Sequence, residues 1–136
     1  MKRSIKSVFN KKNKKKIICL TSYSHNYTKI IDDLVDVILV GDSMSNVIYG
    51  MDSTRTIEDQ VMINHASAVK KAADKSLVFF DLPYNKDFSE SNIVKRVLSI
   101  MKKTSCDGVK IEGNKELEDI IKFLKKRNVP VMAHLG

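Results

Sequence analysis

The sequence predicts an α/β fold with a parallel sheet, and two patterns along its 136 residues indicate this class. Short, wholly apolar runs recur along the chain, and strands that are buried on both faces of a parallel sheet have this composition. Between these runs lie longer stretches in which apolar residues return with the period of an α-helix. Strands and helices therefore alternate, as they do in sheets built from β–α–β units.

Each expected strand ends where a polar residue, a glycine or a proline interrupts its apolar run. The run over 36–40 stops at Gly41, and the run over 76–80 stops before Asp81 and Pro83. The five expected strands are residues 17–21, 36–40, 76–80, 108–111 and 129–133.

Four helices are expected between these strands, each with one apolar face. In the third of them, Ile93, Val97 and Met101 recur at helical spacing. Residues 44–56 are expected to be irregular, with Ser53 and Thr54 capping the helix that follows, and Asn114 is expected to cap the last helix. The expected helices span residues 26–34, 57–73, 89–103 and 115–127.

Two parallel architectures are compatible with this order of elements: a five-stranded doubly wound sheet and part of a (β/α)8 barrel. The length favours the doubly wound sheet, since a closed barrel usually needs about 200 residues or more. The residues at the strand ends, described below, favour the barrel.

The distribution of charge and cysteine excludes several classes of protein. The net charge of +8 is confined to the first sixteen residues, and the rest of the chain has equal numbers of basic and acidic side chains. We therefore expect a basic N-terminal segment, 1–15, and a neutral domain, 16–136. A solvated terminus or a lysine-rich approach to a barrel-capping helix explains the segment better than contact with an anionic polymer, which stays open as an alternative. No apolar run is long enough to span a bilayer. Cys19 and Cys106 form no disulfide framework, which favours the cytoplasm.

Polar side chains follow the expected strands at their carboxyl ends, where the sites of parallel α/β folds form. Taken singly, each of these residues is equally well explained as a turn former, a helix cap, a packed histidine or half of a Lys110–Glu112 salt bridge. Their coincidence at one end of the sheet indicates a functional site. These residues are Thr21 and Ser22 after the first strand, Asp42 and Ser43 after the second, Asp81 after the third, Lys110 and Glu112 at the fourth, and His134 after the fifth.

The chemistry of this set is coherent. Asp42, Asp81 and Glu112 offer the carboxylate oxygens that Mg²⁺ prefers. Such an ion would polarise a 2-oxo acid, with Lys110 holding the carboxylate of that acid and Ser43 donating a hydrogen bond. Nucleotide-binding glycine loops and zinc-protease motifs are absent from the sequence.

A succession of motifs resembles the N-terminal half of the ketopantoate hydroxymethyltransferase family over residues 16–136. The ordered set is highly specific, although no single motif is. The motifs are KIICLTSY at 16–23, ILVGDS at 38–43, GMDST at 50–54, His65, FDLPY at 80–84, VKIEG at 109–113 and PVMAHLG at 130–136.

This resemblance implies the N-terminal portion of a (β/α)8 TIM barrel, similar to the phosphoenolpyruvate-mutase and isocitrate-lyase barrels. The implied activity is hydroxymethyl transfer from 5,10-methylenetetrahydrofolate to 3-methyl-2-oxobutanoate, which gives 2-dehydropantoate in pantothenate biosynthesis through a Mg²⁺-stabilised enolate. It also implies a cytoplasmic homo-oligomer, with no membrane and no nucleic acid as partner.

Residue roles follow from the same resemblance. It implies that Asp42 and Asp81 bind the metal and that Glu112 supports it through water. Ser43 and Lys110 would hold the 2-oxo acid, and His134 would line the pocket. The catalytic base is not assigned to any residue of this chain and is expected beyond Gly136. A truncated chain is therefore expected, and whether it is active alone is left open.

The sequence departs from the family pattern at several places, among them the stretch after Pro83 and the end of the sequence at Gly136, where the family continues. Ser24 stands where the family usually has Asp, and Met44 with Ser45 replaces the usual Leu-Gly. Two alternatives therefore remain: a related barrel enzyme that acts on another 2-oxo acid, and a non-catalytic fragment or binding protein that uses its basic tail.

Overall fold

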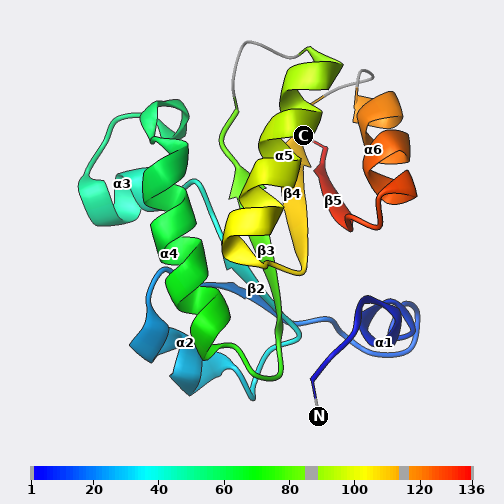
Figure 1. Ribbon diagram of the computed structural model, residues 1–136. Coiled ribbons are helices and arrows are strands. Elements are labelled where there is room, and N and C mark those ends of the chain that lie inside the picture. Colours follow the sequence, from blue (N-terminus) through cyan, green and yellow to red (C-terminus); the bar gives the residue numbers. More distant parts are fainter. Residues whose placement is uncertain (1, 85–88, 114–116, 136) are drawn as a thin grey trace.

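The computed structural model describes residues 2–84, 89–113 and 117–135. Within these ranges one parallel sheet has the strand order β1-β2-β3-β4-β5 (Figure 1). The five expected strands are confirmed, and β3 extends two residues further than expected, through Asp81 and Leu82. The strands are β1 (Cys19–Thr21), β2 (Val37–Val40), β3 (Leu77–Leu82), β4 (Gly108–Glu112) and β5 (Val131–His134).

The strand order decides between the two architectures. A doubly wound sheet reverses its order at a switch point, whereas each strand here pairs with the next one along the chain. Because crossovers between parallel strands are right-handed, an order without reversal places the connecting helices on one face. The fold is therefore a portion of a (β/α)8 barrel, and the doubly wound alternative, which the chain length favoured, is wrong.

Helices α2, α4, α5 and α6 follow one another around the outside of the sheet, as Figure 1 shows, and they match the four expected helices. Two short helices, α1 and α3, lie in segments that were expected to be a basic tail and an irregular loop. The bounds are α1 (Ile5–Phe9), α2 (His25–Ile31), α3 (Met44–Tyr49), η1 (Thr54–Thr56), α4 (Asp59–Ala72), α5 (Glu90–Thr104) and α6 (Leu117–Lys126).

Local capping explains the two unexpected helices. The Ser4 and Ser7 side chains each accept a hydrogen bond from the other's backbone N–H, a capping box that begins α1. Helix α3 ends at Gly50, whose φ of 61° is a left-handed conformation that glycine adopts without strain. Ser53 caps η1 rather than the long helix after it, by accepting from the Arg55 N–H. The expected cap Asn114 lies outside the described residues.

The sheet is buried on both faces in its middle. Val78 and Phe80 of β3 lie in the core beneath the helices, whereas Leu77 and Phe79 form a smaller inner cluster on the opposite face. Val8 of α1 packs against this inner cluster, so α1 lies on the side of the sheet that the other helices leave open. The apolar character of both faces explains why the strands appear in the sequence as continuous apolar runs.

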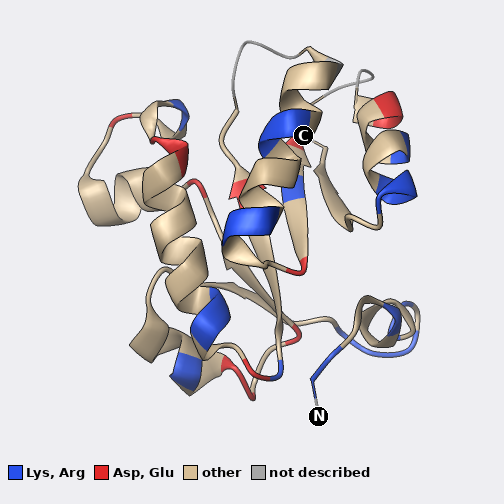
Figure 2. Cartoon of the chain, viewed as in Figure 1, with Lys and Arg blue, Asp and Glu red and all other residues tan. Residues whose placement is uncertain are grey.

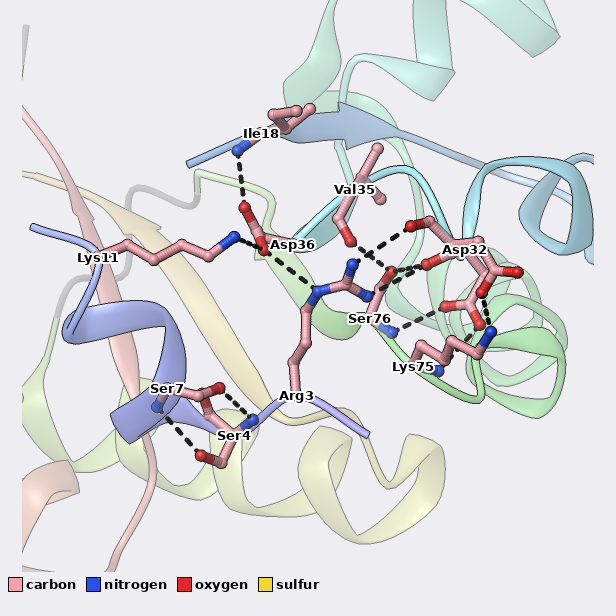
Figure 3. A network of polar contacts seen from close by, with 11 residues as sticks. Arg3, Ser4, Ser7, Lys11, Ile18, Asp32, Val35, Asp36, Lys75 and Ser76 are labelled. Carbon is pink, nitrogen blue, oxygen red and sulfur yellow. Dashed lines mark hydrogen bonds and ion pairs between the residues drawn. The ribbon is translucent and has the colours of Figure 1, made fainter. Parts of the chain in front are cut away.

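The basic N-terminal segment is tied to acidic residues between α2 and β2 (Figure 3). Arg3 Nε donates to Asp36 Oδ1 over 3.1 Å, and its other guanidinium nitrogens donate to the backbone carbonyls of Asp32 and Asp33. Lys11 forms an ion pair with the same Asp36 carboxylate. The segment therefore contributes to the fold, because Arg3 and Lys11 are ion-paired with the domain rather than solvated as in a frayed terminus.

Charge over the remainder of the domain is mixed. Basic and acidic residues are interspersed along its helices and loops (Figure 2), in agreement with the balanced composition after residue 16. None of the helices in the described ranges has the length and apolar character that crossing a bilayer requires.

Replacing Arg3 with alanine is expected to lower the free energy of unfolding by about 1–2 kcal/mol, because it removes two partly buried hydrogen bonds and one exposed one. Urea unfolding followed by circular dichroism would measure the loss. Lys6→Ala is the matched control, since Lys6 is an exposed basic residue of the same segment. Equal losses in the two variants would show that the Arg3 contacts do not hold α1 in place.

Candidate active site

The carboxyl ends of the strands carry charged residues on the inner face of the sheet. Along β3, Phe79 belongs to the inner cluster and Phe80 to the core beneath the helices, so the alternation of side chains turns Asp81 inward. Asp81 stands opposite Lys110 of β4 in the strand register. Register therefore places a carboxylate and an ammonium group next to each other, although 29 positions separate them in the sequence.

Lys110 forms a two-pronged ion pair with Asp81. Its Nζ lies 2.9 Å from Asp81 Oδ1 and 2.8 Å from Oδ2, and the Asp81 side chain is only 5% exposed. Burial raises the pKa of the Asp81 carboxyl, and the nearby negative charge of Asp42 raises it further. The Lys110 ammonium lowers this pKa, but the net shift is upward. The buried carboxylate therefore depends on a neighbouring cation for its charge.

Asp42 and Ser43 lie in the turn between β2 and α3. The Asp42 backbone N–H donates to the Asp81 carboxylate, and the Asp42 charge acts on the same group. Two of the three carboxylates that were predicted to bind metal are therefore neighbours. The sequence was also compatible with a salt bridge between Lys110 and Glu112. In the structure Lys110 pairs with Asp81 instead.

Glu112 and His134 face each other across β4 and β5. His134 Nδ1 lies 3.4 Å from Glu112 Oε2, and both side chains are 41% exposed. This separation is an ion-pair distance, and within the described part of the chain His134 Nδ1 is a buried atom without a hydrogen bond. The two side chains thus form a second, looser pair at the same end of the sheet.

The predicted set of three carboxylates is only partly assembled. Among residues 2–84, 89–113 and 117–135, no three His, Cys, Asp or Glu side chains are grouped closely enough to enclose a metal ion. The structure brings Asp42 and Asp81 together and leaves Glu112 beside His134. The metal-binding role of all three therefore stays a prediction.

A hydrogen-bonded network that sequence reasoning did not assign reaches Ser43. The Tyr23 hydroxyl lies 3.0 Å from Ser43 Oγ, and the His65 ring joins the Tyr23 carbonyl to the Tyr49 hydroxyl. Tyr23 is the second residue after β1, so the reasoning that singled out the other strand ends applies to it as well. His65 lies within α4, and its place in the succession of family motifs singles it out, although its spacing within the helix does not.

Arg96 of α5 fixes the chain just beyond Asp81. Its Nη1 donates to the Pro83 carbonyl over 3.0 Å, and its Nε donates to Asp59 Oδ2 at the start of α4 over 2.6 Å. A planar guanidinium suits this arrangement, because its donors point in fixed directions. The end of β3 is therefore held from the outside by two helices.

The fold and these side chains define the class of protein: a unit of a (β/α)-barrel enzyme, whose site lies at the carboxyl ends of the strands. The family model for ketopantoate hydroxymethyltransferase matches residues 2–136. This chain belongs to that family.

Curated relatives agree with this assignment. The chain is 42% identical over 136 residues to a 3-methyl-2-oxobutanoate hydroxymethyltransferase of Pelagibacter ubique. This alignment covers 100% of the chain and 53% of that relative. It is 41% identical over 126 residues to the enzyme of that name from Anaplasma marginale. This alignment covers 93% of the chain and 46% of that relative. The chain thus spans about half the length of these relatives.

A crystal structure of a phosphonopyruvate hydrolase in complex with oxalate and magnesium has the same fold. The two structures superpose with a TM-score of 0.73, and the superposition covers 96% of this chain and 52% of the hydrolase chain. The sequence identity between them is 9%. At this identity the likeness establishes the fold alone.

Proposed function

We propose that this chain supplies the part of the active site that binds metal and 2-oxo acid for hydroxymethyl transfer from 5,10-methylenetetrahydrofolate to 3-methyl-2-oxobutanoate. The proposal rests on membership of the family together with one observation, the neighbouring Asp42 and Asp81 carboxylates at the strand ends. In this reaction the C3–H bond of the oxo acid breaks and C3 bonds to the methylene carbon. Water supplies the hydroxyl oxygen, tetrahydrofolate leaves, and the product is 2-dehydropantoate, a precursor of pantothenate.

The residues present fit a magnesium ion. Mg²⁺ commonly binds one or two carboxylates and completes its coordination with water and substrate oxygens. Asp42 and Asp81 offer two adjacent carboxylates, and the raised pKa of Asp81 reflects a buried group that a cation would stabilise as the anion. Asp42 and Asp81 would hold the ion and Glu112 would support it through water. Bound magnesium would supply positive charge that polarises the 2-oxo group and favours loss of the C3 proton.

Three side chains of this chain would bind the organic substrate. Lys110, whose Nζ lies at the inner face, would attract the carboxylate of the oxo acid, and the Ser43 hydroxyl would donate to it. His134 would line the same pocket from β5. We assign the base that removes the C3 proton to no residue of this chain, and its expected place beyond Gly136 stays a prediction.

Isothermal titration of the chain with 3-methyl-2-oxobutanoate tests this proposal. We expect binding to be about tenfold tighter with Mg²⁺ than without it, a difference of roughly 1.4 kcal/mol. Pyruvate and phosphonopyruvate serve as controls, because they lack the branched side chain. Equal affinity with and without Mg²⁺ would contradict the proposal, and a preference for an unbranched acid would favour the related barrel enzyme.

We also infer that the chain forms homo-oligomers in the cytoplasm. Strands β1 and β5 end the order of the described sheet, and Ile18 and Leu20 beside the β1 edge are half-exposed apolar residues. Open strand edges promote association between chains. Both cysteines are free thiols in the structure, which supports a reducing compartment.

A further inference from the structure

We propose that Tyr23 is a positioning residue, which orients the Ser43 hydroxyl toward the 2-oxo acid and is itself held in place by His65. This inference rests on the proposed function, because it concerns how that site presents one hydrogen-bond donor. Tyr23 would not touch the reacting atoms. Its effect would reach the substrate through Ser43 alone.

Ser43 is not used as a helix cap, although it occupies the N-cap position of α3. Its backbone is helical, with φ of −55° and ψ of −14°, and its side chain makes no capping hydrogen bond. A capping serine normally has an extended backbone and accepts from an N–H one turn ahead. The Ser43 hydroxyl instead lies 3.0 Å from the Tyr23 hydroxyl, which leaves it available to the inner face of the sheet.

The backbone at Gly41 leaves the space that this pair of hydroxyl groups requires. A Cβ atom at Gly41 would lie 2.9 Å from Ser43 Oγ and 3.7 Å from the Tyr23 hydroxyl oxygen. A side chain at this position would therefore push the Ser43 hydroxyl away from its place. The contact between the Tyr23 and Ser43 hydroxyl groups therefore depends on a glycine at position 41.

His65 fixes Tyr23 through its backbone. His65 Nδ1 lies 2.6 Å from the Tyr23 carbonyl oxygen, which only accepts hydrogen bonds, so Nδ1 carries the proton and donates. In the neutral ring Nε2 then accepts from the Tyr49 hydroxyl, 2.8 Å away. Tyr49 also meets the His65 ring edge to face, at an interplanar angle of 89°. Residues of α3 and α4 together hold the end of β1.

The chemistry of the two hydroxyl groups gives the network a direction. A phenol is a stronger acid than an aliphatic alcohol, so Tyr23 is the better donor of the pair. When Tyr23 donates to Ser43 Oγ, the single proton of Ser43 is directed elsewhere and is available to a carboxylate oxygen of the oxo acid. Without the phenol, the Ser43 hydroxyl would rotate freely and present this proton only part of the time.

A double-mutant cycle tests the proposal, with the dissociation constant of 3-methyl-2-oxobutanoate in the presence of Mg²⁺ as the readout. We expect Tyr23→Phe and Ser43→Ala each to weaken binding by about three- to tenfold, which is the usual effect of one hydrogen bond. The double variant should be no weaker than Ser43→Ala, because Tyr23 acts through Ser43. Tyr27→Phe, which removes the hydroxyl of a half-exposed tyrosine in α2, should leave binding unchanged.

Gly41→Ala is a second variant that leaves Tyr23 intact. It should crowd Ser43 Oγ and weaken binding to a similar extent, while circular dichroism checks that the variants are folded. Unchanged affinity in Tyr23→Phe or Gly41→Ala, or additive losses in the double variant, would overturn the role of Tyr23 and leave the proposed function standing. Failure of the unaltered chain to bind the oxo acid would instead overturn both.

Discussion

Asp81→Asn is expected to abolish magnesium-dependent binding of 3-methyl-2-oxobutanoate. The carboxylate of Asp81 lies between Lys110 and Asp42, and it is the most deeply buried of the predicted metal ligands. An amide keeps the shape but removes the negative charge, and one of its two terminal atoms is a donor that no cation binds. The expected loss of Mg²⁺ affinity is about a hundredfold or more, since second-sphere changes alone cost 10–100-fold.

Direct metal titration separates this effect from a loss of catalysis. Mn²⁺ is a suitable probe, because free and bound Mn²⁺ are distinguished by electron paramagnetic resonance without any substrate. Asp52→Asn, at an exposed aspartate of the loop after α3, is the control and should bind metal normally. If Asp81→Asn binds Mn²⁺ as tightly as the unaltered chain does, Asp81 is not a ligand, and its carboxylate serves only to neutralise Lys110.

Asp32→Ala is expected to lower the free energy of unfolding by about 3 kcal/mol, because it leaves one buried and two partly buried N–H groups without their acceptor. The Asp32 carboxylate accepts from the backbone N–H groups of Lys75 and Ser76 over 2.9 and 2.8 Å (Figure 3), and from that of Asp74 over 3.0 Å. These contacts fix the turn before β3 against the end of α2. Chemical unfolding at neutral pH measures the loss. Asp33→Ala removes an exposed aspartate and should cost about 0.5 kcal/mol or less.

The same carboxylates predict how stability depends on pH. Burial would raise the pKa of Asp32, but hydrogen bonds from Ser76, Lys75 and Asp74 outweigh it and the net shift is downward. Burial would also raise the pKa of Asp36, but Lys11, the Ile18 N–H and Arg3 outweigh it. The net shift at Asp36 is therefore downward as well. A lowered carboxyl pKa stabilises the fold above the unfolded value of about 3.9, and this stability is lost as the pH falls through the native pKa.

Asp32→Ala should therefore flatten the fall in stability below about pH 4, compared with the unaltered chain. Asp81 acts in the opposite sense, because its pKa is raised. The difference between the unaltered chain and the Asp32 variant isolates the Asp32 contribution, since Asp81 is common to both. Parallel acid-unfolding curves for the two proteins would contradict the assigned role of Asp32.

The charged residues of the site show where sequence reasoning stops. Asp42, Asp81 and Lys110 were found from their positions at strand ends, because polar groups that interrupt apolar runs are visible in the sequence. Their partners were not visible. Lys110 was weighed as a salt-bridge partner of Glu112, two positions away, but it pairs with Asp81. The choice depends on strand register, and a shift of one residue would turn each side chain to the other face.

The sequence by itself determined the five strands, the four long helices and the residues of the strand ends, since apolar periodicity and local capping are properties of neighbouring positions. The strand-end residues and the family resemblance also favoured the barrel, and the strand order confirms it. Only the tertiary structure decided the pairing of Lys110 with Asp81 and the docking of Arg3 onto Asp36. It also joined Tyr23 to Ser43 and His65. These contacts link residues 20 to 42 positions apart, and their geometry follows from how the elements pack together.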